Sequence, residues 1–241
     1  TSFTGEGSTF EGGTGTDISV YAGLQASYTV STVSGVVKVT DNQPSTDGND
    51  GQDTIIGIET LEFKTGVQVG VTSPIILDLD GNGIATFTAG TNGARFDLNG
   101  DGIGDEASWI GATEGFLFLD RDGNGTLSNV GELSFTDDVP GATSDLAGLR
   151  AFDSNFDGFL SRDDARFDDF KVWRDSNGDG EAGDDEILSL EKAGVAAIGL
   201  TAQDIDAEYQ FGEVIIVGIG SYTRTDGSAM AFADAALTYW A

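Results

Sequence analysis

The pattern of hydrophobic and polar residues changes near residue 72. In the N-terminal part, polar and apolar residues alternate over residues 26–30 and 36–40, and Ser34-Gly35 separates the two stretches. Alternation with a period of two is typical of half-buried strands, so these stretches predict a hairpin. Residues 54–63 continue with apolar side chains at positions 56, 58, 61 and 63. We therefore expect a β-rich domain over residues 1–71 and a second module over residues 72–241.

In the second part, short apolar runs end directly in acidic residues. Residues 74–78 (PIILD) and 115–119 (GFLFL, followed by Asp120) are of this kind, and they predict buried strands that feed polar loops. Residues 195–200, 213–219, 221–225 and 229–237 are also strand-like, with Asp226-Gly227 as a hairpin turn signal. The sequence thus predicts closing antiparallel strands. An uncleaved export signal is the alternative interpretation of this apolar end.

Three further segments show apolar residues at helical spacing. Apolar side chains lie at 146, 149 and 152, at 165, 167 and 170, and across 185–193, where Gly194 provides a stop signal. This spacing predicts a helix–loop–helix–loop–helix unit over residues 145–194, similar to a compressed EF-hand pair. Together with the strands, it predicts an α+β fold.

One acidic motif, D-x-[DN]-x-[DN]-G, occurs five times after residue 73. The copies begin at Asp78, Asp97, Asp120, Asp153 and Asp175; we number them loops 1 to 5 and count positions from the first Asp of each. Side-chain oxygens at positions one, three and five, with glycine at six, match the twelve-residue calcium loop of an EF-hand. There the sixth residue makes a sharp turn and the twelfth supplies a bidentate carboxylate. Loop 5 fits this pattern through its twelfth residue.

All five loops contribute predicted Ca²⁺ ligands. In loops 1 to 3 the twelfth position lacks a carboxylate, and loop 4 has the shorter Asp there. The predicted ligands are Asp78, Asp80 and Asn82 in loop 1; Asp97, Asn99, Asp101 and Asp105 in loop 2; Asp120, Asp122, Asn124 and Glu132 in loop 3; Asp153, Asn155, Asp157 and Asp164 in loop 4; and Asp175, Asn177, Asp179, Glu181 and Glu186 in loop 5. The alternative is a set of Asp/Gly turns on an acidic surface. Glu106 and Glu114 lie outside the motifs, and we interpret them as surface charge rather than as a glycosidase pair.

A different glycine-rich motif lies near the N-terminus. Residues 12–17 (GGTGTD) match the nonapeptide pattern G-G-x-G-x-D, in which the Asp, here Asp17, binds Ca²⁺ between turns of a parallel β-roll. We interpret residues 1–70 as the closing end of a longer repeat array, because a single turn of such a roll cannot bury its apolar face alone. A glycine-rich β-domain without metal is the alternative.

Composition narrows the chemistry. The net charge of -30 disfavours nucleic acid and acidic membranes as partners, and no apolar run reaches membrane-spanning length. The chain has no Cys and no His, which excludes disulfides, thiol nucleophiles and the usual ligands of zinc, copper and iron. Oxygen-preferring ions remain, and we expect four to six Ca²⁺ whose binding is coupled to folding. A single Met disfavours a calcium sensor, which opens a Met-rich groove.

These motifs resemble the repeat-in-toxin (RTX) family. Residues 73–241 resemble, in the type and order of their motifs, the self-processing module beside RTX repeats in iron-regulated FrpC-type proteins of Gram-negative bacteria. The matching segments are residues 74–83 (PIILDLDGNG), 95–102 (RFDLNGDG), 115–125 (GFLFLDRDGNG), 172–175 (VWRD) and 220–227 (GSYTRTDG). The resemblance implies a secreted or cell-surface module that leaves the cell unfolded by type I secretion and folds on Ca²⁺ outside.

The resemblance also implies a reaction that this chain lacks a group to perform. In the family, calcium-loaded modules cut the Asp-Pro bond at their own start, where the Asp carboxylate attacks its own carbonyl and a lysine captures the anhydride. The matching bond here is Ser73–Pro74, and Ser has no carboxylate. We therefore expect a non-enzymatic, monomeric calcium-binding module of a longer chain. Self-processing at Ser73–Pro74 and an adhesin that binds surface proteins or glycans through Trp109, Trp173 or Trp240 are the alternatives.

Overall fold

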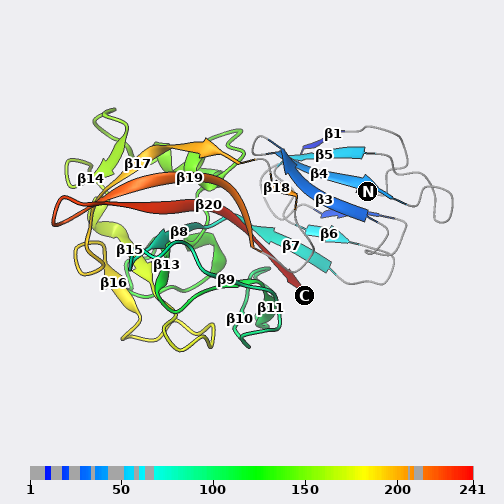
Figure 1. Ribbon diagram of the computed structural model, residues 1–241, viewed down its shortest axis with the longest axis horizontal. Helices are drawn as coiled ribbons and strands as arrows, with labels where there is room; N and C mark the ends of the chain where they lie inside the picture. Colours follow the sequence, from blue (N-terminus) through cyan, green and yellow to red (C-terminus); the bar gives the residue numbers. More distant parts are fainter. Residues whose placement is uncertain are drawn as a thin grey trace.

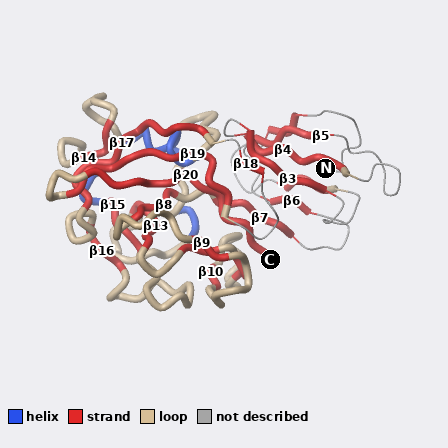
Figure 2. Tube along the Cα trace, in the orientation of Figure 1, coloured by secondary structure: helices blue, strands red, loops and turns tan. Residues whose placement is uncertain are grey.

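The computed structural model describes residues 9–11, 18–21, 28–33, 36–42, 52–56, 60–62, 68–205, 207–208 and 214–240. Within these ranges the chain is built mainly from β-strands (Figures 1 and 2). The same residues contain a single α-helix, of five residues, and several short 3₁₀ turns. The N-terminal strands are β1 (Thr9–Glu11), β2 (Ile18–Val20), β3 (Tyr28–Val33), β4 (Val36–Asp41), β5 (Gln52–Ile56), β6 (Thr60–Glu62) and β7 (Gln68–Thr72).

The remaining elements alternate strands with loops and short helices. The strands are β8 (Ile75–Asp78), β9 (Thr86–Phe87), β10 (Arg95–Phe96), β11 (Asp105–Ala107), β12 (Trp109–Ile110), β13 (Glu114–Leu119), β14 (Phe159–Ser161), β15 (Phe170–Trp173), β16 (Ile187–Ser189), β17 (Val195–Asp204), β18 (Ala207–Glu208), β19 (Ile215–Arg224) and β20 (Ala229–Trp240). The helices are α1 (Asp145–Leu149) and the 3₁₀ turns η2 (Val130–Glu132), η3 (Thr136–Asp138), η4 (Arg150–Phe152) and η5 (Phe167–Asp169).

The long hairpin of β19 and β20 lies at the centre of the largest sheet. The strand order is β14-β17-β19-β20-β8-β13-β15-β16, and Figure 1 shows β19 and β20 as two long, bent ribbons. The hairpin forms around Asp226-Gly227, as predicted from the sequence. Beyond β8, the end of β20 pairs with β7 and also with β11, so β20 connects the region of the acidic loops with the N-terminal strands.

The N-terminal strands form a smaller sheet and extend the larger one. The smaller sheet has the order β1-β5-β4-β3-β18, and its β3–β4 pair is the hairpin predicted around residues 34–35. Two pairs in this region are parallel, β1 with β5 and β2 with β6. The glycine-rich motif with Asp17 lies outside the described residues.

Alternate residues of the central strands face two different cores. In β8, Ile75 and Leu77 join one buried cluster, whereas Ile76 joins the other. In β13, Leu117 and Phe118 divide in the same way. A strand covered on both faces needs no polar alternation, which explains the continuous apolar runs that predicted buried strands here.

The predicted α+β fold with an EF-hand pair is wrong. The entering helix of loop 4 is present as the short α1 and η4, but residues 163–172 and 185–193 do not form α-helices. Residues 163–172 contain a turn, η5 and most of β15, while residues 185–193 contain β16. The described part of the chain is therefore predominantly β.

The sheet provides the physical reason for this correction. β15 lies between β13 and β16, where Val172 is paired with Leu117 on one side and Leu188 on the other. Its neighbour Trp173 is fully buried in the opposite core. The apolar residues on both faces of β15 are therefore buried by the sheet, and no helix is needed to bury them. Loops 4 and 5 also do not pair with each other, because β14 of loop 4 pairs with β17.

Candidate metal-binding loops

One hydrogen bond is common to all five loops. The backbone N–H of the sixth-position glycine donates to Oδ2 of the first Asp at 2.9–3.0 Å in every loop. All five glycines have positive φ, between 76° and 98°, a region that L-residues rarely adopt. The motif therefore specifies the same tight turn in five different surroundings, with the first Asp held inside it.

The third and fifth positions are fixed by a second shared contact. In each loop the fifth-position N–H donates to Oδ1 of the third residue, at 2.8–3.1 Å. The third and fifth side chains also contact each other, because one of them is always an Asn whose Nδ2 donates to the Asp of the pair. The predicted ligands at positions one, three and five are thus brought together in all five loops.

A buried carboxylate closes four of the loops, and we call it the closing carboxylate. It accepts the N–H of the second loop position: Leu98 to Asp105 at 2.8 Å, Arg121 to Glu132 at 2.9 Å, Ser154 to Asp164 at 2.7 Å and Ser176 to Glu186 at 2.9 Å. In loops 3, 4 and 5 its other oxygen accepts the N–H of the ninth position. Four carboxylates at three different sequence offsets therefore occupy the same structural place.

Two of the carboxylate sets are tightly grouped. Among the described residues, one carboxylate oxygen from each of Asp120, Asp122 and Glu132 lies within 4.8 Å of the other two, and the same holds for Asp175, Asp179 and Glu186. Glu181, the predicted seventh-position ligand of loop 5, has an exposed side chain, and its carbonyl accepts the N–H of Gly183 at 2.9 Å.

Burial raises the pKa of Asp105 to about 6. The backbone N–H of Leu98 acts in the opposite direction, whereas the negative charges of Asp101 and Asp97 raise the pKa further. A nearby cation would favour the ionised carboxylate and so oppose both the burial and the like charges.

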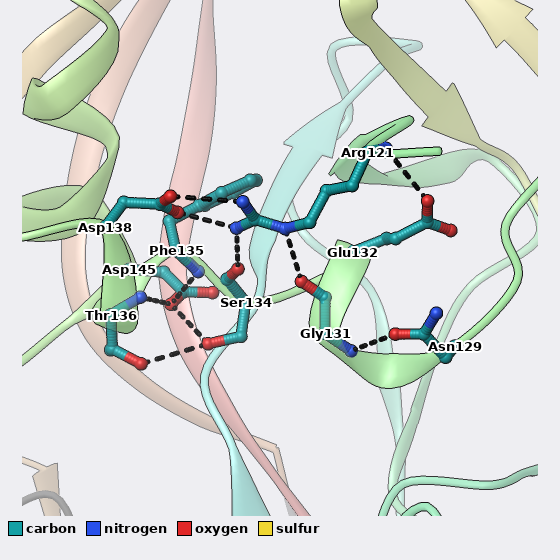
Figure 3. Close-up of polar contacts among 9 residues, drawn as sticks. All are labelled: Arg121, Asn129, Gly131, Glu132, Ser134, Phe135, Thr136, Asp138 and Asp145. Atoms are coloured by element: carbon teal, nitrogen blue, oxygen red, sulfur yellow. Dashed lines mark hydrogen bonds and ion pairs between the residues drawn. The ribbon is translucent and has the colours of Figure 1, made fainter. Parts of the chain in front are cut away.

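Arg121 fixes the segment that carries the closing carboxylate of loop 3 (Figure 3). Its Nε donates to Gly131 O at 2.8 Å and its Nη2 to Ser134 O at 2.9 Å. The guanidinium also forms a bidentate ion pair with Asp138, with distances of 3.1 and 2.6 Å. These contacts hold residues 131–138 against loop 3, which places Glu132 although it stands one position later than an EF-hand would have it.

Loop 5 is anchored by residues far away in sequence. The indole Nε1 of Trp109 donates to Oδ2 of Asp175 at 2.7 Å, and both side chains are buried. The N–H of Arg95 donates to the carbonyl of Asp179 at 3.3 Å, so loop 5 lies against the strand that enters loop 2. Neither contact has a signal in the local motif.

The comparisons with known proteins agree on one family. The family model of the SPM domain matches residues 75–238. The chain belongs to the SPM domain family. It is also 36% identical over 180 residues to the iron-regulated protein FrpA of Neisseria meningitidis serogroup C. That match covers 72% of this chain and 16% of the relative, so the chain is an FrpA-related module that spans a small part of the relative's length.

The bond Ser73–Pro74 directly precedes the matched SPM domain. It joins β7 to β8, and both strands pair antiparallel with β20. Pro74 is buried and its carbonyl accepts the N–H of Ala235 at 3.1 Å, whereas Ser73 is partly exposed. Within the described part of the chain, no helix has the length and apolarity needed to cross a membrane.

Glu114 is a buried residue of the SPM domain, and its interpretation as surface charge is wrong. It is 0% exposed and stands at the start of β13, directly opposite Asp78. Its Oε1 accepts the N–H of Ala85 at 3.2 Å, while its Oε2 is buried and has no hydrogen-bond partner. Burial raises the pKa of Glu114, and the charges of Asp80 and Asp78 raise it further. Glu106, by contrast, is half-buried and pairs with Arg95 at 3.0 Å.

Asp145 is a buried carboxylate that serves none of the loops (Figure 3). Its Oδ1 accepts hydrogen bonds from Ser134 Oγ at 3.1 Å, from Phe135 N at 2.8 Å and from Thr136 N at 3.1 Å. Burial raises the pKa of Asp145 well above its usual range, and the charge of Asp234 on β20 adds to this. Its contacts fix the start of α1 against η3 rather than any acidic loop.

Proposed function

We propose that this SPM domain is a calcium-binding module of a secreted RTX protein, and that it folds and is stabilised when Ca²⁺ binds outside the cell. The observation that carries the proposal is the shared geometry of the loops. Five separate segments hold a first-position Asp over a sixth-position glycine, and four of them receive a buried carboxylate at the same place. Repetition of one geometry on unrelated strands favours a common ligand.

The donor set fits calcium. Every candidate ligand is an oxygen from Asp, Asn, Glu or a backbone carbonyl, which suits a hard cation and not the metals that prefer nitrogen or sulfur. In loop 3, Oδ1 of Asp120 is buried without a hydrogen-bond partner, beside Asp122 and Glu132. A bound Ca²⁺ would supply the charge compensation that these carboxylates lack, with four to six ions as the expected number.

The charge balance supports coupling between binding and folding. The chain carries a net charge of -30, and its candidate ligands are concentrated on five loops. Without counter-ions, the repulsion among these carboxylates opposes the compact state. A ligand that binds only the folded chain stabilises it by about 2.7 kcal/mol per site at a hundred times its Kd. External calcium concentrations would therefore favour folding, and the low calcium of a cytosol would not.

Circular dichroism and calorimetry test this function. The chain is freed of calcium with a chelator and titrated with Ca²⁺, and far-UV dichroism is recorded together with the number of bound ions. We expect the β signal and the unfolding temperature to rise with Ca²⁺, and to rise much less with Mg²⁺ at the same ionic strength. An unchanged spectrum together with no heat of Ca²⁺ binding would refute the proposal.

Self-cleavage at Ser73–Pro74 is the second candidate. The position of this bond favours it, because the SPM match begins at residue 75, immediately after it. Against it stands the side chain of Ser73, which cannot form the anhydride of the resembled reaction. Mass spectrometry after incubation with Ca²⁺ decides between the two: a fragment that begins at Pro74 supports cleavage, and an intact chain excludes it.

An adhesin function has less support. Trp109 and Trp173 are both fully buried and contact each other with ring centroids 5.4 Å apart, so neither presents a platform for a sugar. The side chain of Trp240 lies outside the described ones. A glycan array probed with the calcium-loaded chain would test this alternative.

A further inference from the structure

Loop 1 contains no acidic residue that could close it. After Asp80, the next carboxylate in the sequence is Asp97, which already opens loop 2. In the other four loops, the closing carboxylate follows the first Asp by 8 to 12 residues within the same segment. Nevertheless, the first half of loop 1 is formed like the others, with Asp78 buried and bonded to Gly83. Any closing carboxylate for loop 1 must therefore come from elsewhere in the fold.

We infer that Glu114 supplies this closing carboxylate and that Asp78, Asp80 and Glu114 hold one cation together. The inference rests on the proposed calcium-binding function and assigns a ligand that the loop motif does not contain. Glu114 begins β13 directly opposite Asp78, the first residue of loop 1. Across an antiparallel pair, residues that are directly opposite project to the same face of the sheet.

Glu114 makes one contact that resembles a contact of the other closing carboxylates, although the bond to the second-position N–H that defines them is formed only in loops 2 to 5 among the described residues. In loops 3, 4 and 5, one carboxylate oxygen accepts the N–H of the ninth position. Glu114 accepts the N–H of the eighth position, Ala85, at 3.2 Å. In both arrangements a carboxylate contacts the second half of the loop. In loop 1 this carboxylate comes from the neighbouring strand β13 rather than from the residues that follow the loop in sequence.

The remaining oxygen of Glu114 is unpartnered inside the protein. Oε2 is buried without a hydrogen-bond partner, in a side chain that is 0% exposed. It lies against Gly111, where an added Cβ would overlap it, and the N–H of Gly111 in turn donates to Ala85 O at 2.9 Å. The backbone around Ala85 and Gly111 thus packs closely around the carboxylate of Glu114, while its Oε2 has no hydrogen-bond partner. In its ionised form, a buried carboxylate without a full set of partners is costly unless a cation compensates it.

A count of bound ions tests the inference on the whole chain. Equilibrium dialysis against rising Ca²⁺, followed by metal analysis, is performed on the wild type, Glu114→Gln, Asp78→Asn and the double variant. Glutamine has the shape of glutamate and keeps an oxygen for Ala85 N–H, but it lacks the charge. We expect Glu114→Gln to weaken one ion by about tenfold or more, since even residues that only orient ligands alter metal affinity by about 10–100-fold.

The double variants identify the loop. If Glu114 and Asp78 share an ion, Glu114→Gln with Asp78→Asn loses the same single ion as either change alone, whereas Glu114→Gln with Glu186→Gln loses two. Glu106→Gln, which removes a half-buried carboxylate that pairs with Arg95 and is not a predicted ligand, is the matched control and keeps all ions. Should Glu114→Gln fail to fold, Glu114→Asp keeps the charge, shortens its reach and is expected to weaken the same ion.

Three outcomes overturn the inference, and they are distinguishable from failure of the proposed function. If Glu114→Gln binds as many ions at the same Ca²⁺ concentrations as the wild type, Glu114 is not a ligand. If the Asp78 double variant loses two ions, Glu114 serves a different site. If the Glu114→Asp variant must be used and its affinities are unchanged, the carboxylate does not reach the ion. A wild type that binds no Ca²⁺ would instead overturn the proposed function itself.

Discussion

Loops 1 and 5 begin in the same way and end differently. In both, the fourth-position N–H donates to the first Asp at 2.7 Å and the sixth-position N–H does so at 3.0 Å. Loop 5 then closes with its own Glu186, while loop 1 has no closing carboxylate within its own segment and faces Glu114 from β13. Their surroundings differ too, because loop 5 packs against Trp109 and Arg95.

The comparison shows that local contacts determine how a loop starts, whereas the tertiary structure determines how it closes. The first six residues form through hydrogen bonds among themselves, so they take the same shape wherever the chain places them. Closure needs a carboxylate whose position depends on the segment that follows or on another strand. The acidic motif therefore defines where a loop starts, and the fold determines how it is completed.

The largest expected effect comes from removing the first Asp of loop 5. The carboxylate of Asp175 accepts hydrogen bonds from Gly178, Asp179, Gly180 and the indole of Trp109, whereas the carboxylate of Asp78 accepts those of Gly81 and Gly83. Since each buried donor left unpaired costs about 1–3 kcal/mol, Asp175→Ala should destabilise the calcium-loaded chain by about 4 kcal/mol and Asp78→Ala by about 2 kcal/mol. Urea unfolding followed by tryptophan fluorescence measures both. Equal losses would show that the surroundings of the two loops do not matter.

Replacing the sixth-position glycine by alanine, which adds one methyl group, also tests how the surroundings of loops 1 and 5 differ. A Cβ on Gly180 would lie 2.5 Å from the backbone nitrogen of Arg95, whereas Gly83 has no atom within 4 Å of that position. Both have positive φ, which costs an L-residue about 1–2 kcal/mol. We expect Gly83→Ala to lose about that amount and Gly180→Ala about 3 kcal/mol, because the second also displaces backbone. Thermal unfolding of the two variants checks this, and a smaller loss for Gly180→Ala than for Gly83→Ala would contradict it.

Features that depend on local contacts could be predicted from the sequence, whereas features that depend on tertiary contacts could not. The five loop starts, the two hairpins and the buried strands β8 and β13 could be predicted, because their signals are local. The absence of the EF-hand helices could not be predicted, because the spacing of Phe167 and Phe170 fits the apolar face of a helix as well as it fits a turn followed by a strand that is buried on both faces. Glu114 and Trp109 contact loops 1 and 5 from other strands, and a motif search has no means of finding them. The predicted ligands and the domain boundary at residue 72 remain predictions.

A buried carboxylate outside the loops provides a contrast with all five. The raised pKa of Asp145 means that the folded chain retains a proton that the unfolded chain has released. Its contribution to stability is complete below the unfolded pKa and is lost as pH rises through the folded one. Asp145→Asn should therefore stabilise the chain by about 2 kcal/mol at mildly alkaline pH and flatten the pH dependence.

Calcium separates this effect from those at the loops. Asp145 contacts Ser134, Phe135 and Thr136, and none of these is a candidate ligand. The gain from Asp145→Asn should be the same at two saturating Ca²⁺ concentrations, and the number of bound ions should not change. Urea unfolding between mildly acidic and mildly alkaline pH measures the slope. A lost ion would place Asp145 among the calcium ligands and remove the contrast.

The smallest expected effect is at the fourth position of loop 4. There Phe156 has a φ of 60°, while loops 1, 2, 3 and 5 carry glycine with positive φ. Its side chain is 89% exposed, so packing does not compensate for the left-handed backbone. Phe156→Gly removes the cost of a left-handed backbone, about 1–2 kcal/mol, from the folded state. Glycine also loses more conformational entropy on folding, which costs about 0.5–1 kcal/mol, so we expect the free energy of unfolding to rise by about 0.5 kcal/mol. Phe156→Ala is the control, because it removes the same ring and keeps the unfavourable φ. If both variants gain equally in thermal unfolding, the exposed ring and not the backbone was the cause, and the left-handed backbone at this position would cost loop 4 nothing compared with the glycines of the other loops.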